Sequence, residues 1–419
     1  MTHPTPDTPA RRFADQVART LREAGHQALW AGGCVRDALL GKLPKDYDVA
    51  TDATPDRVRE VFGKRRTIAV GAAFGVITVL PKKGNGPPDE EAGADPIEVA
   101  TFRADGDYGD GRRPDAVRFT SAEEDALRRD FTINGLFYDP LDGRVIDYVG
   151  GEADLAAGVV RAIGDPDERI GEDRLRMLRA VRFACSLGFR LDEATEAAVR
   201  RHAAAITAVS PERIGAEARR MLTERDPARA VRLLRDTGLL SAVLGPLAEA
   251  GDPAVEAAAE RLARLDAPTA ALALATALVG VADASAAAQV ARSVKWTNKE
   301  ADRASWLVAS ADSLEGADRR PWSEVQPLLV HEGGAELVAL RAAARGEADA
   351  AERFCRERLA WPAERLDPPP LVVGADLIAA GLRPGPEFKR LLQRARDAQL
   401  DGEAGDKASA MAWLGLAER

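Results

Sequence analysis

The stretch over residues 30–52, WAGGCVRDALLGKLPKDYDVATD, constrains the fold more than any other part of the chain. The apolar run that ends in this stretch, residues 28–31, predicts a strand. Gly32 and Gly33 then predict a tight turn into a short helix that carries Arg36. Backbone N–H groups in a glycine turn at a helix N-terminus can approach a phosphate closely. We therefore predict that this turn and its arginine bind the phosphates of a nucleotide.

The return segment KDYDV adds two carboxylates to this turn. In a strand over residues 46–49, successive side chains point to opposite faces, so Asp46 and Asp48 are expected on one face. Neighbouring carboxylates repel each other unless a cation lies between them, and oxygen ligands suit Mg²⁺. Either motif alone is a weak signal, because D-x-D occurs at solvated strand ends and Gly-Gly is usually only a turn. Their order and closeness predict a site for a triphosphate and a metal ion.

The strings GGCVRD and KDYDVATDATPD in this stretch resemble motifs of the nucleotidyltransferase superfamily. More narrowly, they resemble its class II branch, which holds the tRNA CCA-adding enzymes and the bacterial poly(A) polymerases. The resemblance covers nearly the whole chain. It implies template-independent addition of nucleotides, most simply CCA, to a tRNA 3′ end by two-metal-ion catalysis. Its partners would be tRNA, ATP and CTP, and its cofactor Mg²⁺.

The fold class expected is α+β, with a small mixed-sheet head domain followed by an all-helical neck, body and tail. Strand and helix signals mix up to about residue 150, and later segments have helical spacing and a composition rich in Ala, Leu, Arg and Glu. We expect a catalytic head over residues 1–150, a base-recognising neck over 151–230, a body over 231–366 and an RNA-binding tail over 367–419.

A third carboxylate, Glu98, lies in the strand-like run over residues 97–101. If this strand pairs beside the D-x-D strand, Glu98 joins Asp46 and Asp48 as a catalytic residue. Outside that context it would be an ordinary solvent-facing strand glutamate.

The string RRDFTINGLFYD, residues 128–139, places two arginines beside Asp130 and Asn134. Adjacent guanidinium groups are costly in a packed site unless they meet anions, which a triphosphate would supply. Asn134 could hold a ribose hydroxyl. The alternative is an arginine pair at a solvated helix end. The string resembles the second motif of the class II family, which implies nucleotide binding by Arg129, Asp130 and Asn134.

The string EDRLRMLRAVRF, residues 172–183, predicts a helix with one apolar face. Asp173, Arg176 and Arg179 then fall at i, i+3 and i+6, so they could point at one ligand. A carboxylate accepts and a guanidinium donates hydrogen bonds, which matches the amino group and ring nitrogen of cytosine and adenine. Uracil and guanine present the opposite order. The alternative is an ion pair between Asp173 and Arg176 within the helix.

Composition limits the partners and the compartment. The chain has 419 residues and a formal net charge of −9, so phosphate binding must come from local basic patches. No run of about 18 apolar residues predicts a membrane span. Three widely separated cysteines predict neither a disulfide framework nor a zinc site. We expect a cytoplasmic, reduced protein without a membrane partner. The candidate basic patches are residues 64–66, 112–113, 219–220 and 388–396.

Several outcomes within the family stay open. Val76 and Gly135 depart from the usual residues of their motifs, and a side chain lost at residue 135 is expected to loosen the local backbone. The segment over residues 374–386 resembles the C-terminal part of CCA-adding enzymes, and the loop over residues 104–116 resembles their flexible loop. The alternatives are a CC-adding or A-adding partial enzyme, a poly(A) polymerase, or an inactive RNA-binding relative.

Overall fold

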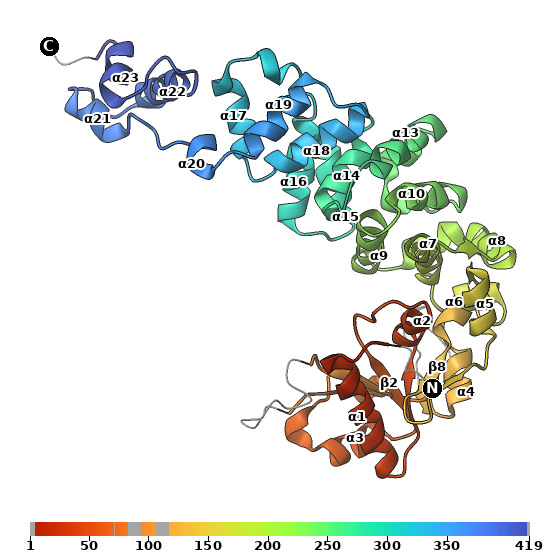
Figure 1. The fold of residues 1–419 in the computed structure, drawn as a ribbon. Helices are drawn as coiled ribbons and strands as arrows, with labels where there is room; N and C mark the ends of the chain where they lie inside the picture. Colours follow the sequence, from red (N-terminus) through yellow and green to blue (C-terminus); the bar gives the residue numbers. More distant parts are fainter. Residues whose placement is uncertain (1–4, 71, 83–93, 106–116, 417–419) are drawn as a thin grey trace. The chain divides into compact units, whose positions relative to one another are not determined.

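The computed structural model describes residues 5–70, 72–82, 94–105 and 117–416. The predicted loop over residues 104–116 and the basic pair at 112–113 therefore lie almost wholly outside the described residues. The chain forms two compact units (Figure 1). The first unit consists of Met1–Glu217 with Asp236–Ala242, and the second of Ala218–Arg235 with Val243–Arg419. The division into head, neck, body and tail stays a prediction.

A mixed sheet forms the centre of the first unit, as predicted. Within the described residues its strand order is β3-β4-β5-β2-β1-β8-β9. Strands β2 and β5 are parallel, and the other neighbours are antiparallel. The strands are β1 (Ala28–Ala31), β2 (Asp48–Thr51), β3 (Thr67–Ile68), β4 (Val76–Val79), β5 (Ile97–Thr101), β8 (Phe137–Asp139) and β9 (Arg144–Ile146).

Helices cover both faces of this sheet. On one face, α1 (Pro9–Glu23) contacts β1 and β2, and α3 (Pro55–Phe62) contacts β4 and β5 (Figure 1). On the other face, α4 (Ala122–Leu127) packs against apolar side chains of β1, β2 and β8. The short helix α2 (Gly33–Leu39) joins β1 to the segment before β2. Strands β6 (Arg103–Asp105) and β7 (Val117–Phe119) form a separate pair.

The remainder of the first unit is mainly helical. It contains α5 (Gly151–Ala157), α6 (Pro166–Glu172), α7 (Arg176–Leu187), α8 (Glu193–His202), the first part of α9 (Pro211–Thr223), and a small parallel pair of β10 (Val159–Val160) and β11 (Arg190–Leu191). Helix α7 lies at the centre of these elements, with most of its side chains buried. It carries two of the predicted base-reading and phosphate-binding arginines.

From residue 227 to the end of the described chain, the predicted all-helical structure is confirmed. Helix α14 is buried along its whole length, because its Ala and Leu side chains let neighbouring helices approach from every side. The helices are α10 (Pro227–Asp236), α11 (Leu240–Val243), α12 (Gly245–Glu249), α13 (Asp252–Ala263), α14 (Ala270–Leu278), α15 (Ala284–Ser293), α16 (Asn298–Ala309), α17 (Trp322–Val330), α18 (Gly334–Arg345), α19 (Ala350–Leu359), α20 (Ala363–Leu366), α21 (Gly374–Ala379), α22 (Pro386–Leu400) and α23 (Lys407–Trp413).

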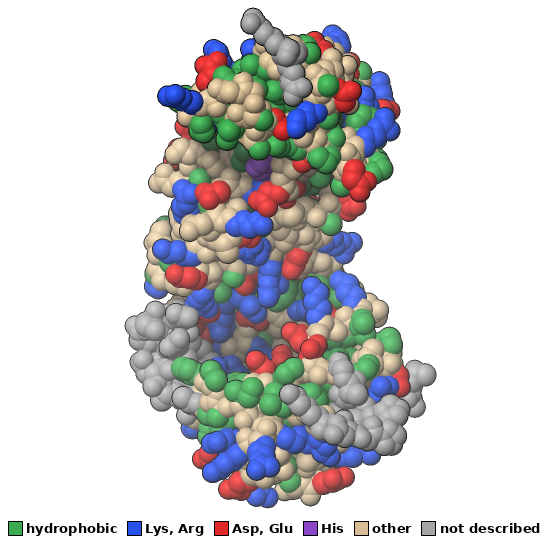
Figure 2. Space-filling model, turned by 90° about the vertical axis from the view of Figure 1, so that its left-hand side faces the viewer, with side chains coloured by type: hydrophobic (Ala, Val, Ile, Leu, Met, Phe, Trp, Pro, Cys, Tyr) green, Lys and Arg blue, Asp and Glu red, His purple; other side chains and the backbone are tan. Residues whose placement is uncertain are grey.

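Charged side chains of both signs lie on the surface, whereas the three cysteines lie in the interior. On the face that Figure 2 shows, basic and acidic side chains are interspersed. The three cysteines, Cys34, Cys185 and Cys355, are buried and free. None of the helices in the described ranges has the length and apolar character that crossing a membrane requires.

Candidate functional site

Two of the predicted carboxylates lie side by side in the sheet. Because β2 and β5 are parallel neighbours, Asp48 and Glu98 are register partners, and the expected strand pairing is confirmed. Asp46 differs from the prediction, because β2 begins only at Asp48 and Asp46 lies in the preceding bend. The side chain of Tyr47 between them is buried while both aspartates are exposed. The two acids therefore still point away from the side on which Tyr47 packs.

The electrostatics of these carboxylates favour a bound cation. Solvent reaches Asp48, yet its pKa is raised to about 6. Desolvation by the surrounding protein is the main cause, the negative charges of Asp46 and Glu98 add to it, and Arg129 opposes them. Within the described residues, no three His, Cys, Asp or Glu side chains converge as a metal cluster. Carboxylate oxygens on neighbouring strands suit a cation such as Mg²⁺, which takes few protein ligands and keeps positions for water and phosphate.

The Gly-Gly turn holds an arginine in place as well as starting a helix. Gly32 has φ +72° and ψ −125°, a conformation available to glycine, and its N–H donates to the carbonyl of Leu136 at 3.1 Å. That N–H is therefore used within the protein, contrary to its predicted role as a phosphate donor. A Cβ on Gly32 would lie 2.8 Å from Nη1 of Arg129. Gly32 thus leaves the room that the Arg129 guanidinium occupies.

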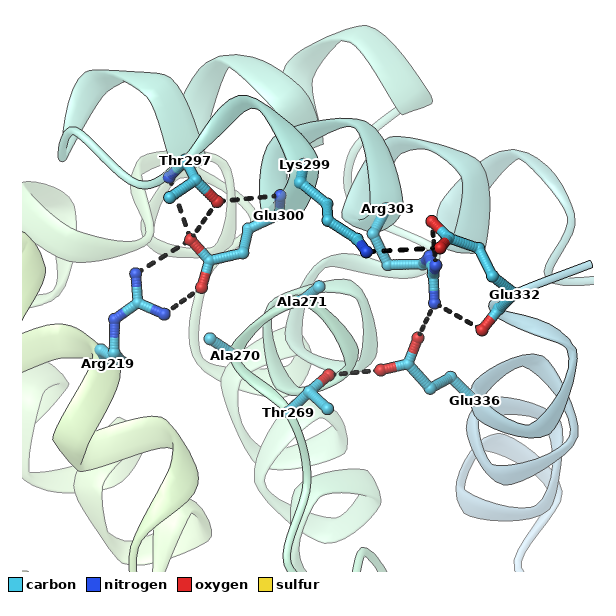
Figure 3. Close-up of a pocket in the computed structure, with 10 residues that line it drawn as sticks. All are labelled: Arg219, Thr269, Ala270, Ala271, Thr297, Lys299, Glu300, Arg303, Glu332 and Glu336. Carbon is cyan, nitrogen blue, oxygen red and sulfur yellow. Dashed lines mark hydrogen bonds and ion pairs between the residues drawn. The ribbon is translucent and has the colours of Figure 1, made fainter.

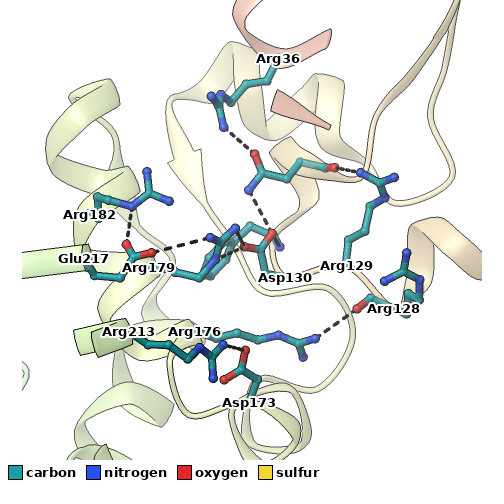
Figure 4. Close-up of polar contacts among 12 residues, drawn as sticks. Arg36, Arg128, Arg129, Asp130, Asp173, Arg176, Arg179, Arg182, Arg213 and Glu217 are labelled. Carbon is teal, nitrogen blue, oxygen red and sulfur yellow. Dashed lines mark hydrogen bonds and ion pairs between the residues drawn. The ribbon is translucent and has the colours of Figure 1, made fainter. Parts of the chain in front are cut away.

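Four of the predicted nucleotide-binding residues form one hydrogen-bonded chain (Figure 4). Arg36 Nη1 donates to Asn134 Oδ1 at 2.7 Å, and Asn134 Nδ2 donates to Asp130 Oδ1 at 3.0 Å. Arg179 Nε donates to the other oxygen of Asp130 at 2.8 Å. The fold therefore brings together residues from α2, η3 (Thr132–Asn134) and α7. Arg36 and Arg179, the two ends of this hydrogen-bonded chain, are about 140 positions apart in the sequence.

Buried acids hold these arginines. Burial by itself would raise the pKa of Asp130, but the charge of Arg179 and hydrogen bonds from Asn134 and Arg179 lower it overall. Asp125, which sequence reasoning missed, binds Arg128 at 2.6 Å and Arg129 at 2.9 Å. The signal was present in the sequence, since Asp125 precedes these arginines by three and four residues in a helix.

Asp173, the first residue of the predicted base-reading face, does not lie in a helix. Helix α6 ends at Glu172, Asp173 is extended with φ −144° and ψ 104°, and α7 begins at Arg176. The Asp173 carboxylate accepts the N–H of Leu175 at 3.0 Å, and this local bond competes with a continuous helix. Asp173 therefore does not share a helix face with Arg176 and Arg179.

The expected partners of Asp173 and Arg176 are also different. Arg176 is 8% exposed and donates to Glu172 at 2.5 Å and to the carbonyls of Arg169 and Arg128 at 2.9 and 3.2 Å. Asp173 instead accepts from Arg213 at 2.7 Å (Figure 4). The alternative of an ion pair between Asp173 and Arg176 is thus wrong as well.

Phe183 supports three guanidinium groups of this region, and sequence reasoning assigned it no role. The ring centroid lies 4.0 Å from Cζ of Arg182, 5.1 Å from that of Arg36 and 5.2 Å from that of Arg179. Each distance lies within the range of cation–π attraction. The ring therefore gives closely spaced cations a favourable contact besides their acids.

Gly135 is more tightly packed than expected. A Cβ at this position would lie 2.6 Å from Cγ2 of Val149 and 3.2 Å from Cδ1 of Ile163. Its N–H donates to the carbonyl of Thr132 at 3.0 Å. The expected loosening of the backbone is therefore wrong, because neighbouring side chains fill the space that an alanine would use.

A second polar feature lies in the second unit. It is an open groove of about 670 Å³ between the end of α9 and helices α14, α16 and α18 (Figure 3). Its cations are paired with acids: Arg219 with Glu300, and Arg303 with Glu336. Three cations and three acids line it, so the groove has no excess positive charge to attract phosphate.

Two family models and several curated relatives match about half of the chain. Residues 28–161 match the family described as Poly A polymerase head domain, and residues 188–250 match the Probable RNA and SrmB- binding site of polymerase A. The chain is 44% identical over 230 residues to a CCA-adding enzyme of Bacillus subtilis and 42% identical over 233 residues to one of Latilactobacillus sakei. These matches cover 55% of this chain in both cases, and 54% and 55% of the relatives, so the chain spans about half the length of the curated relatives it matches.

Solved structures extend the similarity over the whole chain. The Bacillus stearothermophilus CCA-adding enzyme in complex with CTP superposes with a TM-score of 0.77 and 31% identity, covering 97% of both chains. The Thermotoga maritima CCA-adding enzyme complexed with tRNA_CCA has a TM-score of 0.68 and 21% identity, covering 96% of this chain and 94% of that one. The second likeness concerns the fold alone.

Proposed function

The chain belongs to the class II family of tRNA nucleotidyltransferases, which holds the CCA-adding enzymes and the bacterial poly(A) polymerases, and we propose that it adds CCA to the 3′ end of tRNA from CTP and ATP. The observation that carries this proposal is the placement of acids and arginines in the first unit. Asp48 and Glu98 are register partners, and Arg129 is close enough to influence the pKa of Asp48. A carboxylate pair beside arginines suits a metal-bound triphosphate.

The metal site consists of Asp46 and Asp48, with Glu98 beside them. Members of this family are generally metal-dependent, and Mg²⁺ is the ion that these oxygen donors fit best. When bound, Mg²⁺ would lower the pKa of the attacking 3′ hydroxyl and offset charge on the pyrophosphate leaving group. The exposed side of Asp48 leaves the carboxylate accessible to the ion and its water.

The triphosphate is bound by Arg36, Arg129 and Arg179 around the glycine turn. Their bonds to Asn134, Asp125 and Asp130 fix the guanidinium groups before the nucleotide arrives, so little reorganisation accompanies binding. Asn134 holds the ribose while its amide remains tied to Asp130.

The base is read by Asp173 together with Arg176. The Asp173 carboxylate accepts from the exocyclic amino group that cytosine and adenine share. Arg176 is mostly buried and also holds the carbonyl of Arg128, so it connects the base-reading segment to the motif that carries Arg129. The helical second unit, with the tail after residue 367, contributes tRNA binding, and the enzyme acts in the cytoplasm.

A single-nucleotide incorporation assay tests the proposed activity. The purified chain, a tRNA lacking its terminal CCA, Mg²⁺ and labelled CTP should give a labelled product, and Asp48→Asn should lower the rate by about a thousandfold or more. Asp56→Asn is the matched control, because Asp56 is an exposed carboxylate on α3 of the same unit. Thermal unfolding of each variant checks that the protein remains folded.

The alternative is an inactive relative that only binds RNA. It predicts no labelled product from the wild-type chain and the same tRNA affinity in wild type and Asp48→Asn. Full activity of Asp48→Asn would instead contradict the assignment of this carboxylate to the metal.

A further inference from the structure

We propose that the rings of Phe183 and Phe137 position the arginines of the proposed triphosphate site through cation–π contacts, which leave the positive charge of these arginines for the phosphates. This inference rests on the proposed function, since it assigns positioning residues to the proposed binding of CTP and ATP. Both rings and all of the arginines concerned lie in the first unit.

Phe183 is the point at which arginines of two helices meet. It follows Arg179 by four positions in α7, so the two side chains lie on one face of that helix. Arg36 belongs to α2, and its Cζ lies 5.1 Å from the ring centroid, almost the same distance as that of Arg179 at 5.2 Å. The ring is only 5% exposed, so little water screens these contacts. One ring therefore attracts two of the three arginines assigned to the triphosphate.

Phe137 gives the third of these arginines a similar contact. Its ring is fully buried in β8, and its centroid lies 4.9 Å from Cζ of Arg129. A second phenylalanine holds each of the two rings. Phe131 packs edge-to-face against Phe183, with ring centroids 5.8 Å apart, and Phe102 packs in the same way against Phe137 at 5.9 Å. Both supporting rings are therefore fixed within the core of the first unit.

An aromatic ring holds an arginine differently from an acid. Asp130 accepts Nε of Arg179 and lies 2.6 Å from its Nη2, so it occupies two donors and offsets the charge (Figure 4). A ring attracts the guanidinium through its quadrupole and leaves the net charge unchanged. A further acid in the place of Phe183 would compete with the triphosphate. The ring instead offsets part of the repulsion between neighbouring cations and keeps their attraction for phosphate.

Phenylalanine analogues with one, two and three ring fluorines at residue 183 test this proposal. Fluorine withdraws charge from the face of the ring and barely changes the shape of the side chain. We expect KM for CTP to rise with each added fluorine, to about tenfold with three, because two arginines of the site lose attraction. KM for ATP should rise by the same factor, since the ring acts on the triphosphate site. The same KM in all three analogues would overturn the role of Phe183.

Two leucine substitutions separate the cation–π contact from packing. Phe137→Leu should raise KM for CTP and ATP by about threefold, since its ring contacts one arginine of the site. Phe13→Leu is the matched control, because Phe13 is a fully buried ring of α1 in the same unit. It should lower the thermal midpoint by a similar amount and leave KM unchanged. An equal rise of KM in both variants would show that lost packing is the cause, which would overturn the role of Phe137.

Binding of inorganic tripolyphosphate distinguishes this inference from the proposed function. The anion has neither base nor ribose, so calorimetry of the wild-type chain and the fluorinated analogues measures the contribution of the arginines without nucleotide transfer. We expect the dissociation constant to rise with the number of fluorines. A dissociation constant that is equal in all of these proteins would overturn the inference alone. A wild-type chain that binds tripolyphosphate but incorporates no nucleotide would overturn the proposed function instead.

Discussion

At the scale of single residues, Gly32 links backbone conformation to the proposed triphosphate site. Its φ of +72° disfavours any side chain, and its missing Cβ leaves room for the Arg129 guanidinium. Gly41 has a similar φ of +70°, but nothing lies within 4 Å of a Cβ built there. Comparing the same substitution at Gly32 and Gly41 therefore distinguishes the effect of conformational strain from the effect of the contact with Arg129.

Gly32→Ala and Gly41→Ala should each lower the free energy of unfolding by about 1–3 kcal/mol, because both force alanine into a positive φ. Only Gly32→Ala should raise KM for CTP, by about tenfold or more, since the new methyl group moves Arg129 from the carbonyl of Asn134. Urea unfolding and steady-state kinetics measure the two effects. An equal rise of KM in both variants would show that the contact with Arg129 is irrelevant.

Residue types in this site were predictable from sequence, whereas their partners were not. The motif strings brought Arg36, Asn134 and Asp130 forward as candidates, and the structure joins them by hydrogen bonds. Arg213 is 40 positions from Asp173, and no local pattern connects the two. Tertiary contacts between separate helices decide such pairings, so periodicity within one segment does not reveal them.

At the scale of elements, the sequence predicted a helix or strand correctly where residues within that element determine its bounds. Thr and Pro are typical of the cap and the first turn of a helix, and at the start of α3 Thr54 accepts the N–H of Arg57 as its cap, with Pro55 following. The strand over residues 97–101 was also predicted with its correct bounds. The prediction of one helix over residues 172–183 was wrong. The side chain of Asp173 accepts the N–H of Leu175, and the chain is divided there into α6 and α7.

The contact between α9 and α16 gives a pH-dependent prediction for the second unit. A hydrogen bond from Arg219 is the main cause that lowers the pKa of Glu300 from 4.5 to about 2; burial opposes it, and bonds from Thr297 assist it (Figure 3). A lowered carboxyl pKa stabilises the folded protein fully above the unfolded value of about 4.5. This stabilisation is lost as the pH falls from there through about 2.

Glu300→Gln should therefore lower the free energy of unfolding at pH 7 by up to about 1 kcal/mol, since glutamine keeps the cap and loses the charge. The difference from wild type should narrow between pH 4.5 and pH 2. Thermal unfolding at several pH values measures this difference. The control is Glu324→Gln, whose pair with Arg320 is exposed. A difference that stays constant down to pH 2 would exclude the charge as its cause.

At the scale of the whole molecule, the α+β class was predictable because strand signals stop where helical composition begins. The extent of each compact unit was less predictable, because α9 continues across the division between the two units. The segment over residues 374–386 includes α21 and the start of α22. It packs in a small core of the tail that contains Val372, Leu377 and Leu391. A packed tail of this kind would give the proposed tRNA-binding surface a fixed shape.

The length of the product distinguishes the members of the family. With CTP and ATP, we expect the enzyme to extend a tRNA that ends at the discriminator base by three nucleotides and then stop. The reason is that the proposed site would read the amino group shared by cytosine and adenine, while the likeness to a CCA-adding enzyme covers 97% of this chain. Sequencing gels of three primers, ending in no C, one C and two C, measure the number of additions.

Each alternative gives a different pattern on these three primers. A CC-adding enzyme stops after two cytidines, and an A-adding enzyme acts only on the primer that ends in CC. A poly(A) polymerase forms long products from ATP alone, including on an RNA unrelated to tRNA, which is the control substrate. The proposed metal and triphosphate sites of the first unit would serve all four reactions, so substitutions there would not distinguish the four enzymes. The number of nucleotides added distinguishes the four enzymes. Long adenylate tails on the unrelated RNA would contradict CCA addition.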